Sequence, residues 1–195
     1  YNLDYPSVSK LNPGIIYCSI TGFGQTGPYA DRLGYDFIIQ ALSGIMDLTG
    51  EPDGEPQKMG VAFADIFTGL YGVIAIQSAL RVREQSQKGQ HIDLSLMDSM
   101  VAVLANQASN YFVSGKSPKR MGNKHPNIVP YQVFQVKDGH LIIAVGNNEQ
   151  FERFCKVIGL DHLCFSEEFN DNQKRVQNRE KLVKIITSKT IDYSK

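Results

Sequence analysis

Strand-like and helix-like patterns alternate along the first part of the chain, and this order limits the folds that it can adopt. A short β-rich run at 15–20 is followed by apolar residues at helical spacing over 35–48 and over 65–83. A second strand-like run at 91–96 leads into a further helical pattern over 97–113. The order β, α, α, β, α is typical of an α/β fold with a mostly parallel sheet. We expect the first run to be a buried parallel strand.

The composition changes between residues 114 and 130, where Gly, Lys, Pro, Asn and His replace the apolar patterns. Two β-rich runs, 131–136 and 141–145, then flank Asp138-Gly139, a dipeptide that favours a tight hairpin turn. The last helical patterns lie over 150–158 and 175–187. The sequence therefore predicts a second, smaller α+β domain that begins near residue 131.

Charge and composition narrow the classes of partner. The chain has 20 basic and 20 acidic residues among its 195, so it lacks the sustained positive field that nucleic acids and anionic membranes attract. No apolar run approaches the roughly 20 residues that span a bilayer, and the first ten residues do not resemble a signal peptide. A small-molecule substrate is expected, with neither nucleic acid nor membrane as a partner.

The cysteines and the chain ends bear on the compartment. Three scattered cysteines, Cys18, Cys155 and Cys164, fit neither a disulfide framework nor a zinc site. They favour a reducing, cytoplasmic location, although an organelle signal could lie upstream of residue 1. The chain begins without Met and stops just beyond a helical pattern, so we expect an internal piece of a longer protein.

A glycine-rich segment, residues 21–28, follows the first predicted strand. In open α/β sheets, ligands bind beyond the carboxyl ends of the strands. The segment lacks the G-x-G-x-x-G spacing of dinucleotide-binding proteins and the lysine of a P-loop. An ordinary turn is therefore an equally good interpretation, and a Rossmann oxidoreductase is disfavoured.

Four segments in combination resemble the class III CoA-transferases, the CaiB/BaiF or formyl-CoA transferase-like family. They are Cys18 to Pro28, Gly34-Tyr35-Asp36, Ala64 to Leu70 with Asp65, and Gly89 to Asp93. The resemblance covers nearly all of this chain, whereas family members are longer. It implies a partial Rossmann-like large domain over residues 1–115, a linker or lid over 116–130, and the first part of a small domain over 131–195. It also implies an interlocked homodimer for the full-length protein.

The resemblance assigns roles to individual residues. Asp65 matches the nucleophilic aspartate of the family, and Tyr35 and Asp36 match residues that line the CoA and substrate pocket. The residues Gly22, Phe23 and Gly24 are further candidates for this pocket. Relatives that racemise 2-methylacyl-CoA have a similar pattern but carry His at the position of Tyr35, so the tyrosine favours CoA transfer over racemisation. Alternatively, Asp65 is merely the N-cap of its helix, and Tyr35-Asp36 is a surface pair at a helix start.

The segment 119–131 resembles family members that move CoA between dicarboxylates such as succinate and glutarate. Formyl-CoA transferases carry a glycine run where this chain has His125-Pro126-Asn127, so formate and oxalate are disfavoured. The residues Lys119, Arg120 and Lys124 are candidates to bind the distal carboxylate of the acid, and His125 and Asn127 are candidate lid residues. Solvated loop charge is the alternative interpretation.

These residues suit acyl transfer. A carboxylate attacks the thioester, forms a mixed anhydride, and is then converted to a thioester by the released CoA thiolate. The tetrahedral oxyanions need N–H donors, for which the backbone near Gly22 to Gly24 is the candidate.

We therefore expect a CoA-transferase that moves CoA from a donor such as succinyl-CoA to a carboxylic, preferentially dicarboxylic, acid through an intermediate on Asp65. Coenzyme A thioester is the substrate, and neither a permanent cofactor nor a metal is implied. A 2-methylacyl-CoA racemase and an inactive fragment that lacks the upstream CoA site are the alternatives.

Overall fold

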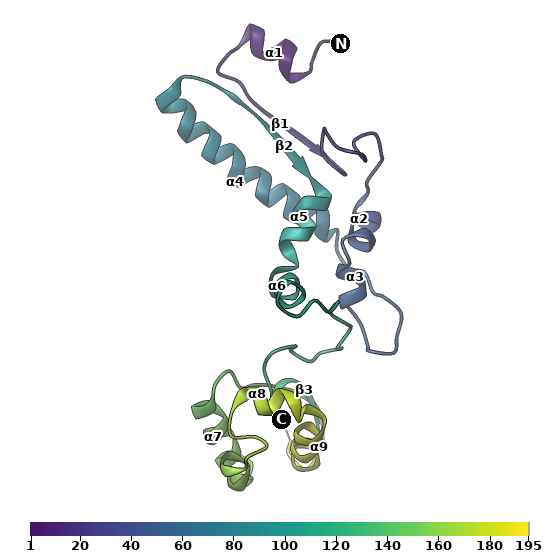
Figure 1. Ribbon diagram of the computed structural model, residues 1–195, viewed down its shortest axis with the longest axis vertical. Coiled ribbons are helices and arrows are strands. Elements are labelled where there is room, and N and C mark those ends of the chain that lie inside the picture. The colour runs from purple at the N-terminus through teal and green to yellow at the C-terminus, as the bar shows by residue number, and fades with distance from the viewer. Residues whose placement is uncertain (195) are drawn as a thin grey trace. The chain divides into compact units, whose positions relative to one another are not determined.

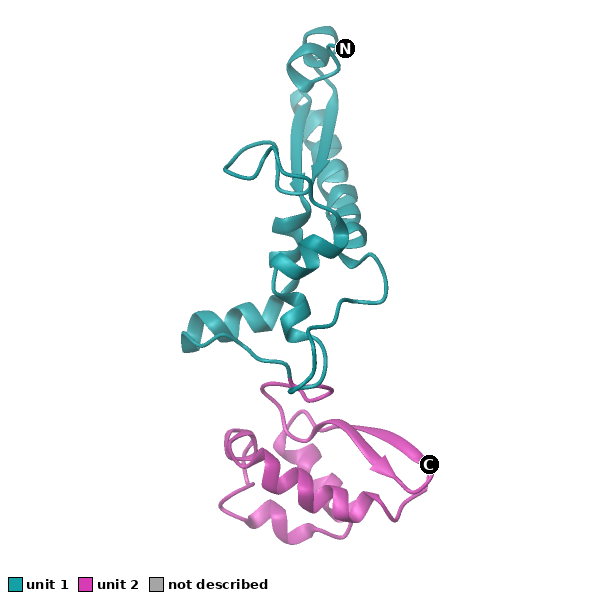
Figure 2. Cartoon of the chain, turned by 90° about the vertical axis from the view of Figure 1, so that its right-hand side faces the viewer, with its two compact units in different colours: residues 1–120 teal, residues 121–195 magenta. Residues whose placement is uncertain are grey.

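The computed structural model describes residues 1–194, which fall into two compact units (Figure 1). Unit 1 comprises Tyr1–Arg120, and unit 2 begins at Met121 (Figure 2). The division falls inside the segment 116–130, whose role as a linker or lid stays a prediction.

Unit 1 contains two parallel strands, β1 (Ile16–Thr21) and β2 (Gln90–Ser95), and helix α1 (Tyr5–Leu11) precedes them. The predicted parallel pairing is confirmed. The predicted burial of β1 is wrong, because Ile20 is 53% exposed. In the described residues this sheet has only two strands, so each strand is an edge.

The longest helix, α4 (Phe63–Ser86), packs against both strands and against α5 (Leu96–Val103). Its buried residues are small, namely Ala64, Thr68, Gly72 and Ala79. A methyl group at Gly72 would lie 3.3 Å from Leu94 Cδ1 of β2, so this glycine permits close packing. By length and composition α4 could cross a membrane, contrary to our expectation, but core helices of soluble proteins have the same properties.

Two of the predicted helices of unit 1 are each divided in two. The pattern over 35–48 forms α2 (Asp36–Leu42) and α3 (Ile45–Leu48), separated at Gly44, whose φ of 85° is left-handed. The pattern over 97–113 forms α5 and α6 (Ala105–Ser114), with a φ of 46° at Ala105. Apolar spacing continues across both breaks, so periodicity alone does not reveal them.

The first strands of unit 2 form the predicted hairpin, β3 (Tyr131–Val136) and β4 (Gly139–Ala144), which is antiparallel as expected. The elements that follow are α7 (Asn148–Val157), a 3₁₀ helix (Asp161–Phe165), α8 (Asn172–Gln177) and α9 (Arg179–Thr190). The predicted helix over 175–187 is thus two helices, and the 3₁₀ helix is not predicted. The buried core includes Phe134, Phe151, Cys155, Leu182 and Ile186.

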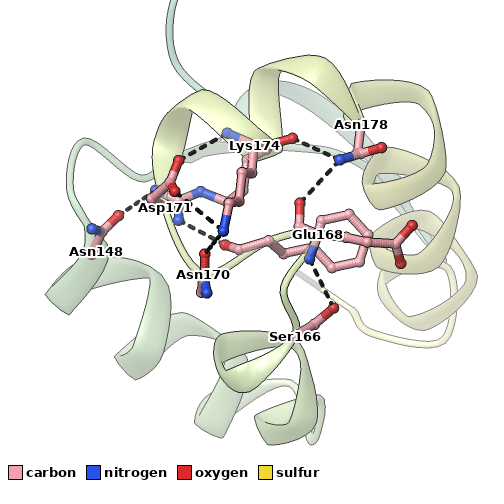
Figure 3. Close-up of polar contacts among 9 residues, drawn as sticks. Asn148, Ser166, Glu168, Asn170, Asp171, Lys174 and Asn178 are labelled. Carbon is pink, nitrogen blue, oxygen red and sulfur yellow. Dashed lines mark hydrogen bonds and ion pairs between the residues drawn. The ribbon is translucent and has the colours of Figure 1, made fainter.

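Side chains fix the boundaries of the unit 2 helices. Asp171 caps α8 by accepting a hydrogen bond from the Lys174 N–H at 2.9 Å. Asn178 Nδ2 donates to the carbonyl oxygens of Glu168, at 3.2 Å, and Lys174, at 3.0 Å (Figure 3). The segment before α8 is therefore tied to the end of that helix.

Candidate functional site

A small core in unit 1 brings three of the predicted site segments together. Ile39 of α2, Ala64 of α4, and Leu96 and Met100 of α5 are buried in one cluster, and Phe23 packs against it. The loop after β1, the start of α2 and the start of α4 are consequently neighbours.

Gly22 and Gly34 allow the loop after β1 to approach the segment before α2. A methyl group at Gly22 would lie 2.6 Å from the Cα of Gly34, which is closer than non-bonded atoms can come. Gly24 has a left-handed φ of 89°. Phe23 is half-buried, and its ring meets that of Tyr29 edge-on at 5.5 Å between centroids.

The backbone of this loop is hydrogen-bonded within the protein. The Gly24 N–H donates to Thr21 Oγ1 at 2.8 Å, and the Gln25 N–H donates to Asp93 Oδ2 at 2.9 Å. Both bonds shape the loop. The Gly24 N–H is therefore not a free oxyanion donor in this arrangement, which corrects the expectation for that group.

Asp65 is the third residue of α4, and its side chain is exposed. The N-cap is Ala62, which has no side-chain capping bond, so the alternative that Asp65 is the N-cap is wrong. The capping bond comes from another helix, because Asp36 Oδ1 accepts from the Ala64 N–H at 2.8 Å. A carboxylate in the first turn of a helix is favoured by about 0.3–1 kcal/mol at exposed positions.

Tyr35 and Asp36 lie at the start of α2 but differ in their surroundings. Tyr35 is 71% exposed and occupies the N-cap position. Asp36 is half-buried, and both of its carboxylate oxygens are bonded within the protein: Oδ1 to Ala64, as above, and Oδ2 to Gln40 Nε2 at 2.8 Å. Gln40 was not predicted as a site residue. Its sequence signal is a polar residue four positions after Asp36 in an apolar helical pattern.

Two of the three basic candidates are already paired with acids. Arg120 forms an ion pair with the Asp47 carboxylate, and its Nη1 also donates to the Asp47 carbonyl at 3.3 Å. Lys124 Nζ lies 3.1 Å from Glu180 Oε1. Lys119 is exposed and forms no ion pair with any described residue. Their role in acceptor binding stays a prediction.

His125 and Asn127 are held by α8 and α9. Arg179 Nη2 donates to the His125 carbonyl at 2.8 Å, and Asn172 Nδ2 donates to the Asn127 carbonyl at 2.8 Å. Burial lowers the pKa of His125, and the charge of Arg179 lowers it further. These residues and Lys124 belong to unit 2, whereas the other predicted site residues belong to unit 1.

A separate cavity of about 370 Å³ lies in unit 1. Its lining is mostly apolar and includes Leu48, Val101, Leu104, Tyr111 and Phe112. None of the predicted site residues lines it. Among residues 1–194 there is also no cluster of His, Cys, Asp or Glu suited to a metal ion.

Comparison with known proteins identifies relatives along the entire chain. A succinate–glutarate CoA-transferase of Agrobacterium fabrum is 54% identical over 195 residues, which are 100% of this chain and 49% of that protein. A succinyl-CoA:glutarate CoA-transferase of Mus musculus is 48% identical over 187 residues, 96% of this chain and 43% of that protein. The chain spans about half the length of the curated relatives it matches.

A solved structure and a family model agree with these relatives. The crystal structure of a CaiB/BaiF family protein from Brucella suis matches with a TM-score of 0.78 and 61% identity, covering 100% of this chain and 51% of that one. The model of CoA-transferase family III matches residues 1–192. The predicted family is therefore confirmed, and the chain belongs to CoA-transferase family III.

Proposed function

We propose that the protein containing this chain transfers CoA from an acyl-CoA donor to a dicarboxylic acid of the succinate and glutarate class. The observation that carries this proposal is the match to CoA-transferase family III over residues 1–192. The names of the two curated relatives support the substrate class. The exposed carboxylate of Asp65 is the group that we assign as nucleophile.

In the proposed mechanism the Asp65 carboxylate attacks the donor thioester, which gives a mixed anhydride and expels CoA thiolate. The thiolate then attacks the Asp65 carbonyl, releasing the donor acid and leaving an aspartyl-CoA thioester. The acceptor carboxylate attacks this thioester, and CoA thiolate leaves again. Attack of the thiolate on the acceptor carbonyl forms the product thioester and regenerates Asp65. No redox step is required.

The loop charges bear on how the acceptor binds. Arg120 and Lys124 are paired with Asp47 and Glu180, so an acceptor carboxylate must compete with these acids. Lys119 carries a charge without an ion pair among the described residues. A dicarboxylate could place its second carboxylate on Lys119, or could displace Asp47 or Glu180 from its basic partner, whereas a monocarboxylate has no second carboxylate to do so.

Mass spectrometry of the active protein after brief incubation with succinyl-CoA, followed by borohydride or hydroxylamine trapping, tests the intermediate. We expect modification at Asp65, its loss in Asp65→Asn, and its retention in Asp53→Asn, because Asp53 is an exposed acid on a loop. Turnover with an unmodified Asp65 would contradict the covalent mechanism. Succinate, glutarate and acetate as acceptors then test the substrate class.

A racemase would exchange the α-proton of a 2-methylacyl-CoA with solvent. We expect no deuterium uptake at that carbon, because the similar racemases have His at the position that Tyr35 occupies in this chain. The homodimer implied by the family resemblance is part of the same proposal, and sedimentation velocity of the full-length protein tests it.

A further inference from the structure

A buried glutamine links α2 to the segment that enters α4. Gln40 has 0% exposure, and each end of its amide is hydrogen-bonded. Its Nε2 donates to Asp36 Oδ2 at 2.8 Å and lies 3.5 Å from the Val61 carbonyl, whereas its Oε1 accepts from the Met59 N–H at 2.9 Å. A buried amide is costly unless it is paired in this way.

All of these contacts converge on the first turn of α4. Met59 and Val61 lie just before the helix, and Asp36 bonds to the N–H of Ala64, the residue before Asp65. The N-cap, Ala62, has no side chain that can cap the helix. The direction of the helix start therefore depends on side chains from α2.

We propose that Gln40 is a positioning residue for Asp65. It fixes the orientation of the Asp36 carboxylate and of the segment 59–61, and these two together aim the first turn of α4. Gln40 itself does not touch substrate. The inference rests on the proposed function, because it concerns the geometry of the assigned nucleophile.

The hydrogen bond between Asp36 and Gln40 also provides a way to distinguish two possible roles of Asp36. If Asp36 acts through α4, its side chain needs one oxygen that accepts from the Ala64 N–H and a second polar atom that hydrogen-bonds to residue 40. If Asp36 binds substrate, its negative charge is required at position 36. Exchanging the two functional groups between positions 36 and 40 keeps the first property and removes the second.

The experiment compares Gln40→Met, Gln40→Glu, and the double variant Asp36→Asn/Gln40→Glu in the active protein. Gln40→Met fills the space but makes none of the bonds. We expect kcat to fall by about 10-fold to 100-fold, as a displacement of about 1 Å would cause, with little change in KM for the acyl-CoA. Gln40→Glu should do the same, because it places two carboxylates in contact.

The double variant should recover part of this loss. The new carboxylate at position 40 accepts from the new amide at position 36 and from the Met59 N–H, while the amide oxygen still accepts from the Ala64 N–H. Recovery would be absent if Asp36 bound substrate through its charge. Ser43→Ala is the matched control, since the buried Ser43 hydroxyl bonds to the Gln40 carbonyl at 3.1 Å but not to the segment 59–64.

Hydrogen exchange of residues 59–66 provides a readout that is independent of turnover. We expect faster exchange in Gln40→Met and an intermediate rate in the double variant, because a carboxylate at position 40 cannot donate to the Val61 carbonyl. A kcat that is unchanged in Gln40→Met, or a double variant no better than Gln40→Glu, would overturn the proposal. If the parent protein transferred no CoA, the proposed function would fail, whereas unchanged exchange in Gln40→Met would sink the positioning role by itself.

Discussion

The Arg175→Met substitution removes a buried charge from the centre of unit 2 and is expected to destabilise that unit strongly. Arg175 has 0% exposure. Its guanidinium donates to the carbonyl oxygens of Val129, at 2.8 Å, and Phe169, at 3.0 Å, and to Asn148 Oδ1, at 2.9 Å. It also lies 4.3 Å from the centre of the Phe151 ring. The side chain thus joins α8 to the residue before the cis-proline at 130, to the segment before α8, and to α7.

The magnitude follows from two opposing effects. Three hydrogen bonds from a charged donor, each worth about 1.5–3 kcal/mol, give an upper bound of about 5–9 kcal/mol. Against this, the buried charge is desolvated, which also lowers the pKa of Arg175, and removing it returns several kcal/mol. Methionine also leaves the three acceptors unpaired. We expect a net loss of about 3–5 kcal/mol of unfolding free energy.

Urea unfolding followed by far-UV circular dichroism measures this loss, since the chain contains no tryptophan. Lys174→Met is the matched control on the same helix. The side chain of Lys174 is 42% exposed, and its Nζ lies 3.1 Å from Asn170 Oδ1 and 3.8 Å from Asp171 Oδ2 (Figure 3), so its loss should cost less than about 1 kcal/mol. A loss below about 1 kcal/mol for Arg175→Met, or equal losses for both variants, would refute the reasoning.

Three further outcomes are expected. Gly22→Ala should lower the unfolding free energy by about 1–3 kcal/mol, because the new methyl group would lie 2.6 Å from Gly34 Cα; an unchanged urea midpoint would show that these segments are not in contact. Burial and the neighbouring thiol of Cys164 raise the pKa of Cys155 to about 12, so iodoacetamide at pH 8 should leave Cys155 unmodified in the folded protein, and rapid labelling by peptide mass spectrometry would contradict its burial. The pKa of His125 is lowered from 6.5, so the unfolded state takes up a proton first on acidification. The stability contributed by neutral His125 should therefore be complete above pH 6.5 and decline below it, and His125→Asn should flatten this part of the pH profile of unfolding.

The sequence predicted the types of element better than their limits. Apolar spacing distinguishes strands from helices, so it predicts β1, β2, α4 and the hairpin of unit 2. It does not predict the break at Gly44, because one left-handed residue leaves the apolar spacing intact. The start of α4 differs from the prediction for another reason. Aspartate is a common N-cap, but the capping carboxylate belongs to Asp36, which lies 28 residues before its partner Ala64.

The candidate site shows the same division between local and distant information. The family resemblance depends on short segments, so it assigns roles to Asp65 and Tyr35, and these roles stay predictions. Gln40 could not be found in this way, because a glutamine within an apolar pattern gains its meaning only from partners about 20 positions later in the chain.

The basic residues of the segment 114–130 also have partners that are distant in the sequence. In sequence, the segment that contains Arg120 and Lys124 is basic and without acids. In the structure, their partners are Asp47 and Glu180, which lie 73 and 56 positions away. Two of the four basic residues of this segment are therefore paired with acids, so a carboxylate that bound to Arg120 or Lys124 would have to displace one of these acids. If these residues bind the acceptor as we propose, its selectivity would depend on the strength of two ion pairs as well as on the presence of basic residues.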